Sequence, residues 1–116
     1  MLAVDADGVF YPCVRFMPFS LSKRHARNIG NVHDGLAINR VRPFLALTVD
    51  TQSPRECMAC GMARGCAWCQ ALNYEEAATD TIYQRATFLC RMHKARVRAN
   101  ERFWATVDSS IAKEVV

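Results

Sequence analysis

Six cysteines are the residues of this chain best suited to chemistry, and four of them lie within thirteen positions. The stretch ECMACGMARGCAWCQ, residues 56–70, contains the pattern Cys57-x2-Cys60-x5-Cys66-x2-Cys69. A C-x2-C step allows two thiolates to bind at one metal site, because the chain can turn tightly between them. Cys13 and Cys90 stand far from this stretch. The spacing predicts a metal site built from the middle of the chain and a remote ligand.

Disulfide bonds are the other common use of six cysteines, and two observations disfavour them. The first ten residues, MLAVDADGVF, are acidic where a secretory signal would be basic, so we expect a cytoplasmic, reducing location. Bridging either C-x2-C pair would close a very short loop and stabilise the fold little. The longest mainly apolar stretch, residues 44–49, is too short to span a membrane, so we expect no membrane partner.

The spacing of the cysteines also bears on which metal they would bind. Zinc ribbons separate their two C-x2-C pairs by about fifteen to twenty residues, whereas only five residues separate the pairs here. An iron–sulfur cluster accepts close-set cysteines together with a remote one, and Cys90 suits that role. The pattern favours iron–sulfur, and zinc remains the alternative.

Several side chains near the cysteines have both a functional and an ordinary interpretation. Gly61 and Gly65 can adopt backbone conformations that other residues avoid, and Trp68 is expected to shield the site from water. Tyr74 is expected to be a packed aromatic. Solvated or structural roles are expected for the three histidines, because six cysteines are available as ligands; they are His25, His33 and His93.

The charge of the chain is moderately basic. The formal net charge is +4, from 15 basic and 11 acidic residues. The densest basic run comprises Arg85, Arg91, Lys94, Arg96, Arg98 and Arg102. A solvated helix face is the ordinary interpretation of such a run. An anionic partner, such as nucleic acid or an acidic peptide, is the functional one, and nucleic acid is disfavoured.

The sequence predicts one α+β domain over residues 1–116, and the elements of this domain must position the cysteines. We expect a β-hairpin over residues 2–12, with a turn at residues 5–8 and Pro12 limiting the second strand. Residues 13–40 are expected to be rich in loops, with short helices near residues 43–48 and 67–78. A long helix is predicted over residues 84–107, on an apolar stripe formed by Phe88, Met92, Ala95, Ala99, Phe103 and Val107. The result would be a small, irregular metal-cluster domain with an N-terminal hairpin, cysteine-rich loops and a long C-terminal helix.

Taken together, Gly8-x4-Cys13, the central cysteines and the distant Cys90 resemble the SPASM domain of radical SAM enzymes. The stretches GCAWCQALNYE and QRATFLCRMHKARVRAN are similar to the C-terminal region of radical SAM peptide maturases, especially those acting on Cys-rich or CXXX-repeat peptides. The resemblance runs from about residue 2 to residue 104, and six of the family's seven cysteines have a counterpart.

SPASM domains hold two auxiliary [4Fe-4S] clusters whose ligands are interleaved along the chain. By position, the resemblance assigns one cluster to Cys57, Cys60, Cys66 and Cys90, and a second cluster to Cys13 and Cys69. The family's remaining cysteine would precede Met1, so the second cluster is expected to be incomplete. The last step of the central motif is C-x2-C, where the family has C-x3-C.

The resemblance implies an auxiliary-cluster domain of an enzyme that modifies a Cys-rich precursor peptide, acting in electron transfer or substrate positioning. The C-x3-C-x2-C motif that binds the catalytic cluster and S-adenosylmethionine in radical SAM enzymes does not occur in this sequence. We therefore expect the chain to be inactive alone and to act with a radical SAM catalytic barrel, upstream or on a separate chain. A small zinc-binding module whose basic helix contacts nucleic acid or another partner is the alternative.

Overall fold

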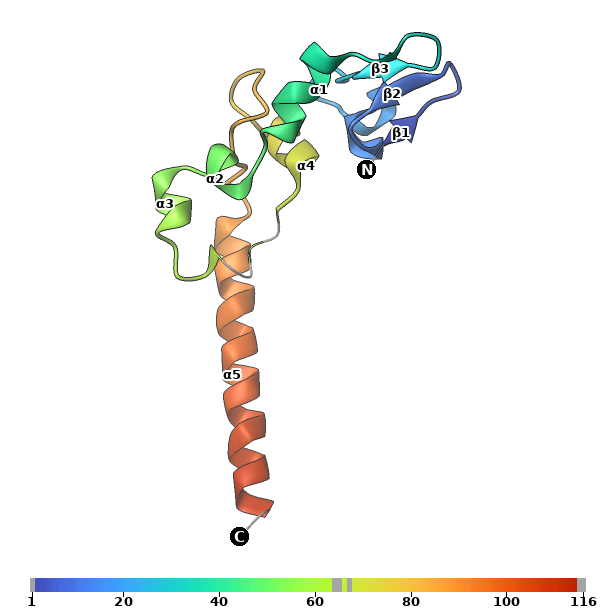
Figure 1. Cartoon of the computed structure of the whole chain (residues 1–116). Coiled ribbons are helices and arrows are strands. Elements are labelled where there is room, and N and C mark those ends of the chain that lie inside the picture. The colour runs from blue at the N-terminus through green and yellow to red at the C-terminus, as the bar shows by residue number, and fades with distance from the viewer. Residues whose placement is uncertain (1, 64–65, 67, 115–116) are drawn as a thin grey trace.

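The computed structural model describes residues 2–63, 66 and 68–114, with residues 109–114 as helix backbone only. Figure 1 shows a small sheet at one end of the molecule, short helices in the middle and one long helix that projects away from both. The chain is therefore α+β, as the sequence predicts.

The sheet is formed by two successive hairpins. Its four strands are antiparallel in the order β1-β2-β3-β4, and they are β1 (Ala3–Val4), β2 (Val9–Tyr11), β3 (Gly30–Asn31) and β4 (Gly35–Leu36). The first hairpin is the one predicted, and β2 ends directly before Pro12. Asp5 stabilises its turn, since Oδ1 accepts hydrogen bonds from the amides of Asp7 at 3.0 Å and Val9 at 2.9 Å. Gly8 completes the turn with a φ of +76°.

The second hairpin lies within the segment predicted to be loop-rich. Ala37 N–H donates to the carbonyl of Ile29 across it, and Asn31 Oδ1 accepts from the amides of His33 and Asp34 at its turn. Gly35 has a φ of +77°, which an Asp-Gly pair in a hairpin commonly provides. The Asp34-Gly35 pair was the signal for this turn, and the strands were missed because they are only two residues long.

Short helical elements connect the sheet to the cysteine-rich segment. They are η1 (Val14–Phe16), η2 (Pro18–Ser20), α1 (Ile38–Leu45), α2 (Val49–Gln52), α3 (Arg55–Met58) and α4 (Gln70–Glu75). The helix predicted near residues 43–48 is therefore α1, displaced toward the N-terminus, with Pro43 in its last turn. Proline is tolerated there at the cost of one main-chain hydrogen bond.

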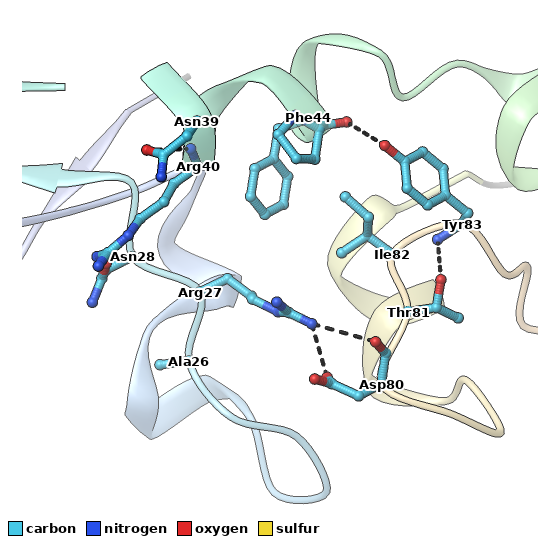
Figure 2. Close-up of a pocket in the computed structure, with 11 residues that line it drawn as sticks. Ala26, Arg27, Asn28, Asn39, Arg40, Phe44, Asp80, Thr81, Ile82 and Tyr83 are labelled. Atoms are coloured by element: carbon cyan, nitrogen blue, oxygen red, sulfur yellow. Dashed lines mark hydrogen bonds and ion pairs between the residues drawn. The ribbon is translucent and has the colours of Figure 1, made fainter. Parts of the chain in front are cut away.

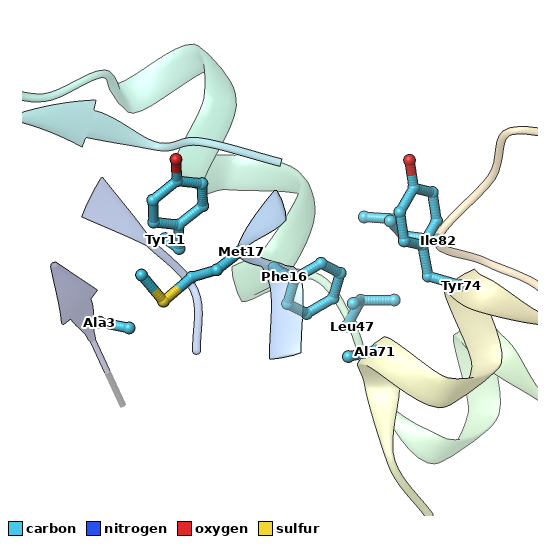
Figure 3. Close-up of a cluster of buried hydrophobic side chains, with 8 residues drawn as sticks. All are labelled: Ala3, Tyr11, Phe16, Met17, Leu47, Ala71, Tyr74 and Ile82. Carbon is cyan, nitrogen blue, oxygen red and sulfur yellow. The ribbon is translucent and has the colours of Figure 1, made fainter. Parts of the chain in front are cut away.

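The hydrophobic core joins the sheet to α4 (Figure 3). Its buried residues are Ala3, Tyr11, Phe16, Met17, Leu47, Ala71, Tyr74 and Ile82. Phe16 lies at its centre, with ring centroids 5.1 Å from Phe44 and 5.8 Å from Tyr74. The Tyr74 ring is fully buried, and its hydroxyl is hydrogen-bonded to Asp80 at 2.8 Å. Tyr74 is thus the packed aromatic that the sequence predicts.

The long helix is α5 (Cys90–Glu114), and most of its surface is uncovered. The molecule measures 69 × 29 × 24 Å, with a radius of gyration of 19.5 Å, against about 13 Å for a compact domain of this length. Phe88, Met92 and Phe103 on the apolar stripe are each 54–60% exposed. Within the described part of the chain, no helix is long and apolar enough to cross a membrane.

The helix begins at Cys90 and not near residue 84 as predicted. The preceding residues make tertiary hydrogen bonds, which compete with helix formation: Arg85 binds Ser53, and the Ala86 amide donates to Asn73 Oδ1 at 2.9 Å. Cys90 N–H donates to the Thr87 carbonyl at 3.0 Å, so the first turn of α5 starts with this thiol.

Candidate metal centre

Four cysteine side chains line one cavity between the cysteine-rich segment and the start of α5. They are Cys57, Cys60, Cys66 and Cys90. The cavity has a volume of about 110 Å³, several times the roughly 30 Å³ that a water molecule occupies in the liquid. Its other lining residues are mainly apolar or basic: Val49, Ser53, Met58, Met62, Ala63, Arg85, His93 and Lys94. Thiols from two separate segments of the chain therefore line a space larger than a single ion.

Consecutive turns bring the first three thiols to this cavity. Cys57 lies in α3, and the Cys60 amide donates to its carbonyl at 3.2 Å. The Ala63 amide then donates to the carbonyl of Cys60 at 2.9 Å, and the Cys66 amide donates to the carbonyl of Ala63 at 3.1 Å. The first of these bonds closes a four-residue turn from Cys57 to Cys60, which is the tight turning that a C-x2-C step requires.

Gly61 does not supply a left-handed conformation to these turns. The described glycines with positive φ are Gly8, Gly30 and Gly35. A side chain at position 61 would meet no atom within 4 Å. Gly61 therefore does not use the positive-φ conformation that glycine permits, which fits the ordinary turn role. Gly65 lies outside the described residues.

A buried polar network places the start of α5 beside the turns. Gln52 at the end of α2 is 1% exposed, and its Nε2 donates to the carbonyl of Ile82 at 2.7 Å. Its Oε1 accepts from Trp68 Nε1 at 2.6 Å and from Asn73 Nδ2 at 2.7 Å. Because Asn73 also holds the Ala86 amide, this network fixes the segment that leads into Cys90.

Trp68 belongs to this network. Its indole N–H is bound to Gln52, and the side chain is not one of the described residues that line the thiol cavity. The indole therefore anchors the cysteine-rich segment to α2. The interpretation of Trp68 as a shield between the cavity and water finds no support in this placement.

Arg85 is a charged group that contacts one of the thiols directly. Its Nη2 donates to Cys66 Sγ at 3.2 Å, while Nη1 donates to Ser53 Oγ at 2.9 Å. Burial raises the pKa of the Cys57 thiol, Arg85 opposes that shift, and the neighbouring Cys90, Cys66 and Cys60 add to it. The four thiols therefore lie near enough to act on one another electrostatically, and the guanidinium offsets part of their charge when they ionise.

The donor set fits a cluster that has several metal corners. Among the described residues, no three His, Cys, Asp or Glu side chains converge closely enough to hold one metal ion. A zinc ion with four thiolates at about 2.3 Å needs its sulfurs within about 4 Å of each other. An iron–sulfur cluster binds each thiolate at a different iron, so its ligands surround a volume without meeting at one point. The four cysteines that line the cavity supply the number of thiolates that one [4Fe-4S] cluster binds.

Cys13 and Cys69 lie elsewhere. Cys13 immediately precedes η1 and Cys69 immediately precedes α4, two elements that contact each other. Both side chains pack against the hydrophobic core, and Arg15 Nη1 lies 3.9 Å from Cys69 Sγ. Neither thiol lines the four-thiol cavity. The structure thus places Cys69 apart from Cys66, although only two residues separate them in the sequence.

His93 is a candidate that the sequence analysis assigned to a solvated or structural role. It lies one turn after Cys90 on α5 and lines the same cavity. Its Nε2 atom is buried and has no hydrogen-bond partner among the residues that the structure describes. The spacing Cys90-x2-His93 was the available signal, since residues three apart on a helix share a face.

A second cavity has no cysteine among its lining residues. It has a volume of about 560 Å³ and lies between α1, the segment around Arg27 and the loop at residues 80–83. Figure 2 shows Arg27 pointing at Asp80, where an ion pair of 2.9 Å forms, and Tyr83 Oη donates to the carbonyl of Pro43 at 3.3 Å. These contacts hold the 80–83 loop against α1, which supports the polar network at Ile82.

Comparisons of the chain with protein-family models, with curated proteins and with solved structures give no significant match.

Proposed function

We propose that this chain is an auxiliary [4Fe-4S] cluster-binding domain of a radical SAM enzyme that modifies a Cys-rich peptide. The observation that carries the proposal is the cavity lined by Cys57, Cys60, Cys66 and Cys90. Two of its features support a cluster: three thiols come from the central motif and the fourth from the distant Cys90, as in the SPASM pattern, and all four line one cavity. Cys13, Cys57, Cys60, Cys69 and Cys90 are free thiols, which suits the reducing cytoplasm proposed as the location of the chain.

In this proposal the four thiols would each bind one iron, and the bound cluster would supply one-electron transfer. Arg85 would offset the negative charge of the thiolates from the side of Cys66, at 3.2 Å. The apolar part of the lining, which includes Val49, Met58 and Met62, would limit the access of water. Lower exposure to water is one of the factors that set the reduction potential of such clusters.

Cys13 and Cys69 would provide part of a second cluster site. Both precede elements fixed to the hydrophobic core, so their positions are set by the fold before any metal binds. Two thiolates leave the site with open positions, which a further cysteine, a partner chain or a substrate thiolate could fill. The proposed partners are therefore a radical SAM catalytic barrel and a Cys-rich precursor peptide.

Metal content after anaerobic reconstitution of the full chain with ferrous iron and sulfide tests the proposal. At least about four iron and four acid-labile sulfide per chain are expected, with the broad visible absorption of iron–sulfur clusters. Cys57→Ala and Cys90→Ala should each abolish the cluster of the four-thiol cavity. Gly61→Ala is the matched control, because it changes the same segment at a position with open space. Stoichiometric zinc without sulfide, or full iron retention in both cysteine variants, would refute the proposal.

A zinc-binding module with a basic helix is the second candidate, and the exposure of α5 favours it. The basic residues of its described part are all exposed: Arg91, Lys94, Arg96, Arg98 and Arg102. Fluorescence anisotropy with short single- and double-stranded DNA and RNA would test for nucleic-acid binding, whose affinity should fall steeply between 50 and 200 mM salt. Zinc uptake together with such binding would support this candidate over the first.

A further inference from the structure

Three side chains with nitrogen groups line the four-thiol cavity in addition to the thiols, those of Arg85, His93 and Lys94. Arg85 is bound to one of the thiols, and His93 has a buried nitrogen without a partner among the described residues, so these two carry the argument. Arg85 approaches from the segment before α5, and His93 approaches from the first turns of α5. Neither residue belongs to the ligand set expected from the cysteine pattern. Both residues lie where they can stabilise negative charge on a bound cluster. The inference drawn from this rests on the function proposed above.

Arg85 is held in place from both sides of its guanidinium group. Nη1 donates to Ser53 Oγ at 2.9 Å, and Nη2 donates to Cys66 Sγ at 3.2 Å. A planar guanidinium that is bound at two nitrogens loses its rotational freedom, so its positive charge stays beside the sulfur.

His93 presents a buried polar atom for which the described chain supplies no partner. Nε2 is inaccessible to solvent and unbonded, and a buried polar group without a hydrogen bond is costly. The side chain lies beside the thiols in an otherwise largely apolar wall. A sulfur atom of a bound cluster is an acceptor that could satisfy this nitrogen when it carries a proton.

We propose that Arg85 and His93 are positioning residues that hydrogen-bond to sulfur atoms of the bound cluster and raise its reduction potential. Reduction adds one electron and no proton to a site that is already negatively charged through its four thiolates. A fixed positive charge and an N–H dipole stabilise the reduced form more than the oxidised form, because the reduced form carries one more negative charge. Arg85 has the larger effect, since it contributes a full charge.

A redox titration of the reconstituted full chain with dithionite, followed by the electron paramagnetic resonance signal of the reduced cluster, tests this inference. In Arg85→Met, the ratio of reduced to oxidised cluster at a fixed potential should fall by about tenfold, which is about 59 mV for a one-electron couple. His93→Leu should lower the ratio by about threefold. Arg96→Gln is the matched control, because it removes an exposed positive charge of α5 that does not line the cavity.

Conservative variants keep the test decisive if a variant fails to hold the cluster. Arg85→Lys preserves the charge and His93→Gln preserves an N–H donor, so both should give midpoints between those of the wild type and of the deleting variants. Midpoints of all cluster-loaded variants equal to that of Arg96→Gln would overturn the inference, while iron and sulfide at wild-type levels would leave the proposed function intact. Failure of the wild-type chain to take up iron and sulfide would instead refute the proposed function.

Discussion

Replacing Gln52 by leucine removes the centre of the polar network while it preserves most of the side-chain volume. Gln52 makes three hydrogen bonds, to Ile82, Trp68 and Asn73, at 2.6–2.7 Å, and it is 1% exposed. The loss of three bonds at about 1 kcal/mol each predicts a destabilisation of about 3 kcal/mol, and the partner groups left without a bond inside the protein add to this value. A domain of this size is stable by only about 5–15 kcal/mol, so the effect should be large.

Urea unfolding followed by tryptophan fluorescence and circular dichroism measures this change. Gln84→Leu is the control, because Gln84 accepts one exposed hydrogen bond, from the Ala78 amide at 3.0 Å; it should lower the free energy of unfolding by about 1 kcal/mol or less. Gln52→Leu should also weaken iron binding at the four-thiol cavity, since the network fixes the segment that leads into Cys90. A free energy of unfolding within 1 kcal/mol of the wild-type value would refute the role assigned to the network.

Two further predictions concern the sheet. The backbone hydrogen bond from Val9 is the main cause of a lowered pKa for Asp5, so its stabilising effect is complete above the unfolded pKa of about 3.9 and is lost as the pH falls through the lower folded value. The stability difference between wild type and Asp5→Asn, measured by urea unfolding, should therefore shrink below pH 4; a constant difference would contradict the assignment. Gly30→Ala should lower the melting temperature markedly, because a Cβ at a φ of +149° would lie 2.1 Å from the Gly35 carbonyl oxygen. Gly35→Ala, where the Cβ meets no atom within 4 Å, should cost less, and equal losses would argue against this steric cause.

Local sequence patterns predicted the elements that depend on neighbouring residues. The first hairpin follows from the Asp-Gly turn between two apolar runs, and α5 follows from its apolar stripe. The second hairpin carried the same Asp-Gly signal, but its strands are too short to show alternation. The start of α5 could not be predicted, because it depends on contacts of Arg85 and Ala86 with Ser53 and Asn73, residues that are distant in the sequence.

The same distinction applies to the candidate site. The C-x2-C spacing indicated turns between the thiols, and the structure has these turns at Cys57 and Cys60. Cys90 lies beside these turns because the buried Gln52 links the segments that carry them. No sequence motif indicated this role of Gln52. His93 was set aside because cysteines were the more obvious ligands, and only its buried, unbonded nitrogen drew attention to it.

The two thiol sites are supported in different ways, and this difference predicts how metal binding and folding are linked. Cys13 and Cys69 pack on the hydrophobic core, so their positions are stabilised by buried apolar surface. The described residues between Gln52 and Gln70 include none that is buried, so hydrophobic burial contributes little to the turns of the four-thiol cavity. Such turns are stabilised by polar contacts and by the cluster that the thiols bind. Cluster binding therefore adds directly to the local stability of this segment. Cluster loading should therefore protect the amides of residues 57–63 from hydrogen exchange far more than those of the core element α4. Equal protection in both segments would show that the cavity is rigid before it binds a cluster.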